Sequence, residues 1–123
     1  MKNLGRILIF FLIPHAIYAS IKASLDTHYV EAGDTVTYSL SISGDDVKPP
    51  HIEKICGEDV ISSSTQRSMQ MINSNITKSI TFSYEFVAQK SCEIKPVEVE
   101  VDGKLQKSNA ESLKVVPASV LQK

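Results

Sequence analysis

The strongest constraint in this sequence is a strict alternation of apolar and polar residues between positions 36 and 42. Val36, Tyr38, Leu40 and Ile42 are separated by threonine or serine at every intervening position. Successive side chains of a β-strand point to opposite faces, so a period of two places the apolar residues together on one face. The pattern is typical of a half-buried antiparallel strand, with one face on a core and the other in water.

The same alternation recurs along the chain and predicts a domain built from short strands. An Asp102-Gly103 pair directly follows Val101 and favours a two-residue hairpin turn, because a type I′ turn needs positive φ at both central residues. The next residues are therefore expected to return along the preceding strand. Strands are predicted at residues 21–25, 36–42, 80–86, 97–101, 104–107 and 112–116, the last ended by Pro117.

The stretch 60–75 has a weaker pattern and is rich in serine, threonine, glutamine and asparagine. We expect one strand here, followed by a meander with a solvated edge. About seven short strands separated by turn signals predict an all-β fold, an immunoglobulin-like antiparallel β-sandwich over residues 20–117. Residues 118–123 are expected to be a tail or the start of a linker. A small barrel fits the same periodicity.

Residues 1–19 have the layout of a secretory signal peptide. Lys2 and Arg6 precede an apolar run of isoleucine, leucine and phenylalanine, which is followed by proline and then by small or polar residues. A membrane-spanning helix needs about 20 apolar residues, and this run is shorter. We expect cleavage between Ala19 and Ser20.

Two alternatives to that cleavage are cleavage after Ala23 and retention as an uncleaved N-terminal anchor. No later run of about 18 apolar residues follows. The mature domain is therefore expected to be exported to the periplasm, with membrane attachment only through an uncleaved signal or a downstream segment.

The charge balance gives no basic surplus. The chain has 13 Lys+Arg and 14 Asp+Glu, and loss of Lys2 and Arg6 with the signal peptide moves the net charge from −1 to −3. Proteins that bind nucleic acids neutralise phosphates with lysine and arginine. A nucleic-acid partner is therefore not expected.

Residue patterns of enzymes and metal sites are weak or missing. His28 and His51 do not have the spacing of a zinc site, and we expect both on the surface or in turns. The acidic pairs at 45–46 and 58–59 lack the spacing of a calcium loop. The serines at 62–64 lie outside any nucleophile-elbow motif. We predict no catalytic, cofactor-binding or metal-ligating residue, and a protein that is not an enzyme.

Cys56 and Cys92 are the only cysteines of the chain. An even count in an exported chain favours a disulfide, and Cys92 stands at the start of a short strand before Pro96. A redox-active or metal-bound pair is the alternative, although the spacing is not Cys-x-x-Cys and no flanking lysine or histidine indicates a lowered thiol pKa.

Met69, Met71 and Ile72 allow two interpretations. They could form an exposed apolar patch that binds a partner, but residues of this type more often lie in a core or at a strand edge. We favour core or strand edge from the sequence.

Five segments of the chain follow one another in a characteristic order and spacing. They are VEAGDTVTYSL at residues 30–40, Pro49-Pro50 with Ile52, VISSST at 60–65, TFSYEF at 81–86 and IKPVEVEVDGK at 94–104. Together they resemble the N-terminal domain of the BatD oxygen-tolerance (aerotolerance) family across nearly the whole mature chain. The segment 55–60 departs from the family pattern, which has an aromatic-aliphatic strand there, so the cysteine pair marks a subgroup.

The resemblance implies an exported immunoglobulin-like domain without enzymatic activity. Members of this family are longer proteins held in the inner membrane by a later hydrophobic segment. They are encoded with von Willebrand factor A-domain proteins and a MoxR-type ATPase, and are linked to oxidative-stress tolerance or envelope maintenance.

Three functional hypotheses follow. The first is a periplasmic protein-interaction domain that docks envelope proteins, including Bat-type proteins with von Willebrand factor A domains, through a sheet face or an edge strand. The second is a thiol-active periplasmic protein that uses Cys56 and Cys92. The third is an adhesin-like structural module that pairs an open edge strand with another chain.

Overall fold

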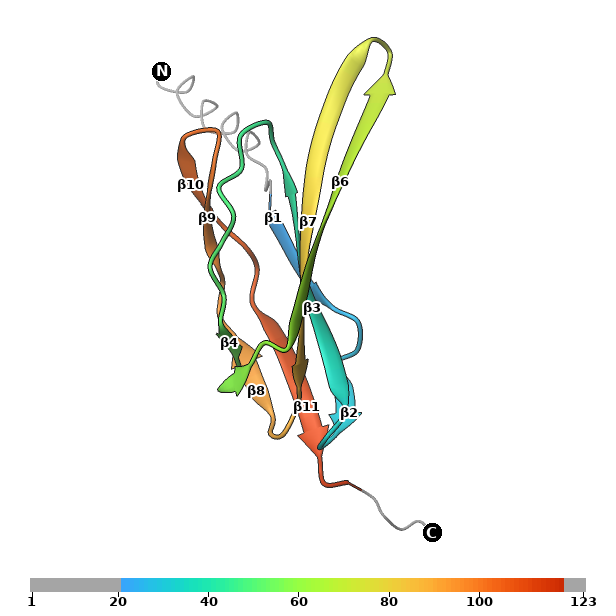
Figure 1. Ribbon diagram of the computed structural model, residues 1–123, viewed down its shortest axis with the longest axis vertical. Helices are drawn as coiled ribbons and strands as arrows, with labels where there is room; N and C mark the ends of the chain where they lie inside the picture. Colours follow the sequence, from blue (N-terminus) through green and yellow to red (C-terminus); the bar gives the residue numbers. More distant parts are fainter. Residues whose placement is uncertain (1–20, 119–123) are drawn as a thin grey trace, which may run out of the picture.

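The computed structural model describes residues 21–118, which form two facing layers of β-strands (Figure 1). The predicted signal peptide at 1–19, the Ala19–Ser20 cleavage site and residues 119–123 of the predicted tail lie outside the described residues. Within the described part, no helix is long and apolar enough to cross a membrane.

The first layer is a four-stranded antiparallel sheet with the strand order β1-β3-β7-β6. Its central pair, β3 with β7, runs in register from Thr35 opposite Val87 to Ser43 opposite Ser79. The strands are β1 (Ile21–Leu25), β3 (Thr35–Ser43), β6 (Ser62–Ile72) and β7 (Asn75–Val87).

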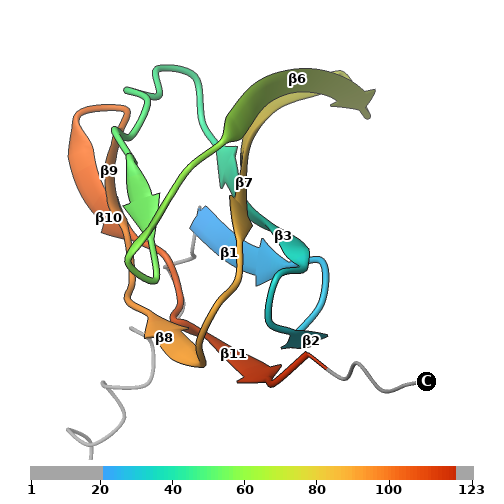
Figure 2. The same cartoon turned by 60° about the horizontal axis from the view of Figure 1, so that its bottom comes forward.

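The second layer consists of three smaller sheets, seen apart from the first layer in Figure 2. β4 (Lys54–Ile55) pairs with β5 (Glu58–Asp59), and β9 (Glu98–Val101) pairs with β10 (Lys104–Lys107). The third sheet has the order β2-β11-β8, from β2 (Tyr29–Glu31), β11 (Glu111–Val116) and β8 (Cys92–Ile94). β11 runs parallel to β2, an exception to the antiparallel arrangement that we predicted.

The apolar residues of the alternating segments form one core between the layers, so the predicted immunoglobulin-like sandwich is confirmed. Val36, Leu40, Ile42 and Phe86 are fully buried, each at 0% exposure. The other buried apolar residues are Ile21, Ala23, Leu25, Val30, Tyr38, Ile55, Ile80, Phe82, Tyr84, Ala88, Ile94, Val99, Val101 and Leu113.

The outer face of the first layer carries a row of hydroxyl groups. Ser39 lies 3.2 Å from Ser83 between hydroxyl oxygens, and Ser41 lies 3.2 Å from Thr81. Short hydroxyl side chains that pair across strands leave this face polar and hydrated. The period of two thus separates an apolar inner face from a polar outer face.

The prediction for residues 60–75 is wrong in its second half. Instead of one strand and a meander, the chain forms a single strand, β6, and returns as β7 through a tight turn at Asn73 and Ser74. These two residues have φ values of 53° and 68°, as a two-residue hairpin turn requires. Glycine is the usual residue at positive φ, and serine seldom adopts it. Because this turn contains no glycine, the sequence did not signal it.

The predicted hairpin at Asp102-Gly103 is confirmed, with φ values of 51° and 82°. The Asp102 carboxylate also accepts hydrogen bonds from the backbone N–H groups of Asp45 (3.1 Å) and Asp46 (2.7 Å). The turn therefore also fixes the chain segment that leaves β3.

Tyr38 carries a buried polar atom that has no partner. Its side chain is 1% exposed, and among residues 21–118 its Oη is the only buried side-chain oxygen or nitrogen without a hydrogen bond. Burial raises the pKa of Tyr38 above its ordinary value of 10.0, an effect that the neighbouring Ser108 hydroxyl partly offsets although it makes no hydrogen bond to Tyr38 Oη. The Ser108 hydroxyl already accepts a hydrogen bond from Val97 N (2.9 Å) and donates to Asn109 O (3.3 Å).

Tyr38→Phe is expected to raise the free energy of unfolding at pH 7 by up to about 1 kcal/mol, because it removes a desolvated hydroxyl and keeps the ring. Urea unfolding measures this change. Tyr84→Phe is the control, since Tyr84 lies opposite Tyr38 in the register and its hydroxyl is not left buried without a partner. A destabilised Tyr38→Phe would show that the hydroxyl is bonded in solution.

Burial raises the pKa values of both Tyr38 and Tyr84, which predicts a loss of stability at alkaline pH. The folded state keeps the phenolic protons at pH values where the unfolded chain has lost them. The resulting stability is fully present below about pH 10 and is lost as the pH rises through the folded-state pKa values. Urea midpoints followed from neutral to alkaline pH should fall less steeply in Tyr38→Phe than in the wild type, and equal slopes would contradict this assignment.

Candidate functional site

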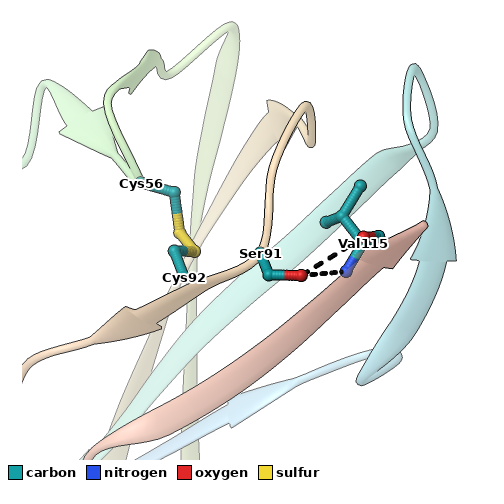
Figure 3. The surroundings of a disulfide bond; sticks show 4 residues. All are labelled: Cys56, Ser91, Cys92 and Val115. Atoms are coloured by element: carbon teal, nitrogen blue, oxygen red, sulfur yellow. Dashed lines mark hydrogen bonds between the residues drawn. A yellow bond between two sulfur atoms is a disulfide. The ribbon is translucent and has the colours of Figure 1, made fainter. Parts of the chain in front are cut away.

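The structure joins Cys56 and Cys92 in a disulfide (Figure 3), with their Cα atoms 5.8 Å apart. Cys56 and Gly57 form the turn between β4 and β5, both at positive φ, and Cys92 is the first residue of β8. Both cysteines are partly buried and pack against the core. The bond therefore fastens the small β4–β5 hairpin to the β2-β11-β8 sheet.

Ser91 extends this attachment next to Cys92. Its hydroxyl accepts a hydrogen bond from Val115 N at 2.8 Å and donates one to Val115 O at 3.2 Å (Figure 3). The side chain thus takes the place of a backbone partner just beyond the last β8–β11 pair, Leu113 opposite Cys92. This end of the second layer is held by one covalent bond and two side-chain hydrogen bonds.

The remaining candidate residues are dispersed on the surface. His28 Nε2 lies 2.7 Å from Glu111 Oε1, and His51 Nε2 lies 2.8 Å from Glu53 Oε2, with most of each ring exposed. Among residues 21–118, no three His, Cys, Asp or Glu side chains come together as metal ligands. The described residues that sequence analysis examined for chemistry are therefore not brought into one site.

Of the acidic pairs, 45–46 lies in the loop after β3 and 58–59 forms β5. Lys54 Nζ donates to Asp59 Oδ1 at 2.8 Å across the β4–β5 hairpin, and this bond lowers the pKa of the Asp59 carboxyl. Both side chains are largely exposed, so the pair adds little to stability.

The most unusual surface of the molecule is the end of the β6–β7 hairpin. β3 stops at Ser43 opposite Ser79, so residues 69–78 have no other strand beside them in the sheet. We call these residues the β6–β7 arm. It extends beyond the other strands and curves away from the second layer (Figures 1 and 2).

The arm exposes large apolar side chains. Met69, Met71, Ile72 and Ile76 have exposed fractions of 65%, 69%, 56% and 54%. Met71 lies opposite Ile76 and Met69 opposite Lys78, on the same face of the sheet as the buried Ile80 and Phe82. The core-forming face of the first layer therefore continues past the end of the second layer, and no other described residue covers it there.

Of the two interpretations of Met69, Met71 and Ile72, a core location is wrong. All three lie on an edge strand. Met69 and Met71 form an exposed patch together with Ile76, which sequence analysis missed, and Ile72 is exposed on the opposite face. The available signal was the spacing of Met69 and Met71 in phase with Ile80 and Phe82 across an Asn73-Ser74 turn. Large contiguous apolar patches on the surface of soluble domains are often interaction sites.

Comparison with known protein families identifies this domain. The family model described as "BatD DUF11 like domain" matches residues 23–115. The chain belongs to the BatD family. The match spans the BatD domain from β1 to β11, including both cysteines and the arm. Searches of the curated proteins and of the solved structures gave no significant match.

Replacing both cysteines of this BatD domain by serine is expected to lower the free energy of unfolding by about 3–4 kcal/mol. The disulfide closes a loop with a sequence separation of 36. Its removal restores the conformational entropy of that loop to the unfolded chain, which gives a free-energy change of this size. Urea unfolding of the double variant, with the reduced wild type as the matched control, measures the loss. A change below about 1 kcal/mol would show that the bond adds little to the fold.

Proposed function

We propose that this BatD domain is a non-enzymatic protein-interaction domain, exported to the periplasm, that binds other envelope proteins. The observation that carries the proposal is the β6–β7 arm, which presents four large apolar side chains to solvent at the end of a sheet. A well-packed domain gains nothing from exposing them, whereas a binding surface buries them on association. Bat-type proteins with von Willebrand factor A domains are the first partners to test, because the family resemblance implies them.

A specific observation also favours the thiol-active hypothesis as a second candidate. The disulfide lies at a turn, and both of its cysteines are only partly buried. A cycling bond would link the domain directly to oxidative stress. Measuring the reduction potential separates the two roles, because structural disulfides in exported proteins have potentials below about −300 mV. A value in that range would reject the redox role.

The interaction proposal predicts that Met71→Thr weakens binding and Leu105→Thr does not. Met71 on the arm and Leu105 on β10 are equally exposed, each at 69%, so the two substitutions remove similar exposed apolar area in different layers. Binding of the purified chain to a Bat-type von Willebrand factor A domain is measured by titration calorimetry. Burial of one such side chain predicts about a tenfold loss for Met71→Thr.

A broader experiment covers other envelope partners. The mature domain and its two variants serve as bait in envelope extracts, with recovered proteins quantified. Recovery that depends on Met71 and not on Leu105 supports the proposal. Recovery of no envelope protein by the wild-type chain, or equal recovery by all three baits, would count against it.

A further inference from the structure

The two edges of the four-stranded sheet differ in whether their outward backbone groups are hydrogen-bonded. Asp26 N donates to Thr37 O, so even-numbered residues on this side of the sheet bond to β3. Bonding alternates along an antiparallel pair, and the backbone groups of the odd-numbered β1 residues therefore point outward. Ala23 lies at the middle of β1, and Asn109 binds both of its groups. Ala23 N donates to Asn109 Oδ1 at 2.8 Å, and Asn109 Nδ2 donates to Ala23 O at 3.1 Å. The β1 edge is therefore capped at its middle residue from the second layer.

Within residues 21–118, the β6 edge has no such cap. Gly44 N donates to Lys78 O, one residue beyond the last β3–β7 pair. The backbone groups of even-numbered β7 residues therefore bond to β3, and those of odd-numbered β7 residues bond to β6. By the same alternation, every second residue of β6 turns its N–H and C=O groups to the open edge. These residues are Ser63, Thr65, Arg67, Met69 and Met71.

β6 also lacks the features that normally protect an edge strand. It is 11 residues long and entirely exposed, with no proline, lysine or glycine, and Arg67 is its only charged residue. Natural edges are kept from pairing by short length, by lysine or proline, or by a cover. A long open edge without these features is suited to accept another strand.

The side chains of an added strand would enter two hollows beside β6. One, of about 500 Å³, lies between the arm and the loop after β3 and includes Val47, Met69 and Ile80 in its lining. The other, of about 400 Å³, is lined by Pro49, Ile52 and Phe82 among others. Both hollows lie on the core-facing side of the sheet, where the side chains of the odd-numbered β6 residues also lie. Arg67 lines both hollows.

The charges of this face indicate the character of the partner. Arg67 has no ion pair or hydrogen bond to any described residue, whereas Lys78 lies 3.9 Å from the Asp45 carboxylate. An acidic side chain of a partner strand, placed opposite Arg67, would complete this face. Opposite charges directly across a strand pair stabilise it, and like charges destabilise it.

We propose that β6 accepts an extended strand from a partner protein, with an acidic residue opposite Arg67 and apolar residues at alternate positions on either side. This inference rests on the proposed interaction function and locates it. A second copy fits less well, because Arg67 is the midpoint of β6 and symmetric antiparallel pairing would oppose two Arg67 side chains. Two features of the site select the partner strand. The open β6 edge binds its main chain, and the two hollows bind every second side chain.

The test uses two synthetic peptides that alternate threonine and valine, one with a central glutamate and one with a central lysine. Binding to the full chain is titrated, and hydrogen exchange is followed at each β6 amide. We expect the glutamate peptide to bind about fivefold more tightly, and Arg67→Glu to reverse this order. The bound peptide should slow exchange at the odd-numbered amides of residues 63–71 and leave the even-numbered amides, already bonded to β7, unchanged.

A matched pair of variants isolates the backbone edge. Met69→Pro removes an outward N–H, at a position where an edge strand tolerates proline, and Met69→Thr keeps the N–H while removing the same apolar side chain. Met69→Pro is expected to weaken peptide binding about tenfold relative to Met69→Thr. Slow exchange at the even-numbered amides of β6 verifies that both variants retain the β6–β7 hairpin.

Several outcomes would overturn strand addition. These are no binding of either peptide at about millimolar concentration, protection outside the odd-numbered β6 amides, equal binding by the two Met69 variants, or a dimer of the chain that protects these same amides. If a Bat-type partner binds Met69→Pro and Met69→Thr equally, strand addition is wrong and the interaction function stands. If the glutamate peptide protects β6 and no envelope protein is recovered, strand addition stands and the choice of partner is wrong.

Discussion

The pairing of β3 with β7 is the interaction on which the rest of this structure depends. It holds residues from both strands in one register, and alternate positions supply the fully buried Val36, Leu40, Ile42 and Phe86. Burial of these side chains provides the hydrophobic stabilisation that a domain of this size needs. Because β7 has 13 residues and β3 has 9, the same pairing also determines where the core ends and the arm begins.

The second layer depends on side-chain attachments to a degree that the first does not. Two of its three sheets have only two strands, and an isolated two-stranded sheet is marginal by itself. Three polar side chains and one disulfide compensate for the missing ladders. Ser91 binds Val115, Ser108 binds Val97, Asn109 binds Ala23 of the first layer, and Cys56 is bonded to Cys92.

The sequence predicts the elements in which period and turn chemistry agree. The strands around Val36–Ile42 and Ile80–Phe86, the Asp102-Gly103 hairpin and the cysteine pair all follow from local patterns. The short β2, β4 and β5 do not, because two or three residues cannot display a period. The β6–β7 hairpin was missed for a different reason: its turn uses Asn73-Ser74 without glycine, and its inward positions hold Arg67, Met69 and Met71, which are not buried. Sequence patterns report burial, so a strand that leaves the core loses its signal.

That loss of signal is also what makes the arm informative about function. An unprotected edge strand invites association with other chains, and selection removes such edges unless they are used or covered. The opposite edge shows how this fold covers one, since Asn109 satisfies both backbone groups of Ala23 from the other layer. On β6 the corresponding groups stay open, beside two hollows lined in part by apolar residues and an arginine without a carboxylate partner among the described residues. The outer face of the same strand is neutral and, apart from Ile72 at its end, polar, with Ser68 bonded to Ser79 at 2.9 Å, which favours association by the edge over stacking by the face. An edge left open on one side of a sheet that is capped on the other is most simply explained as a site for a strand.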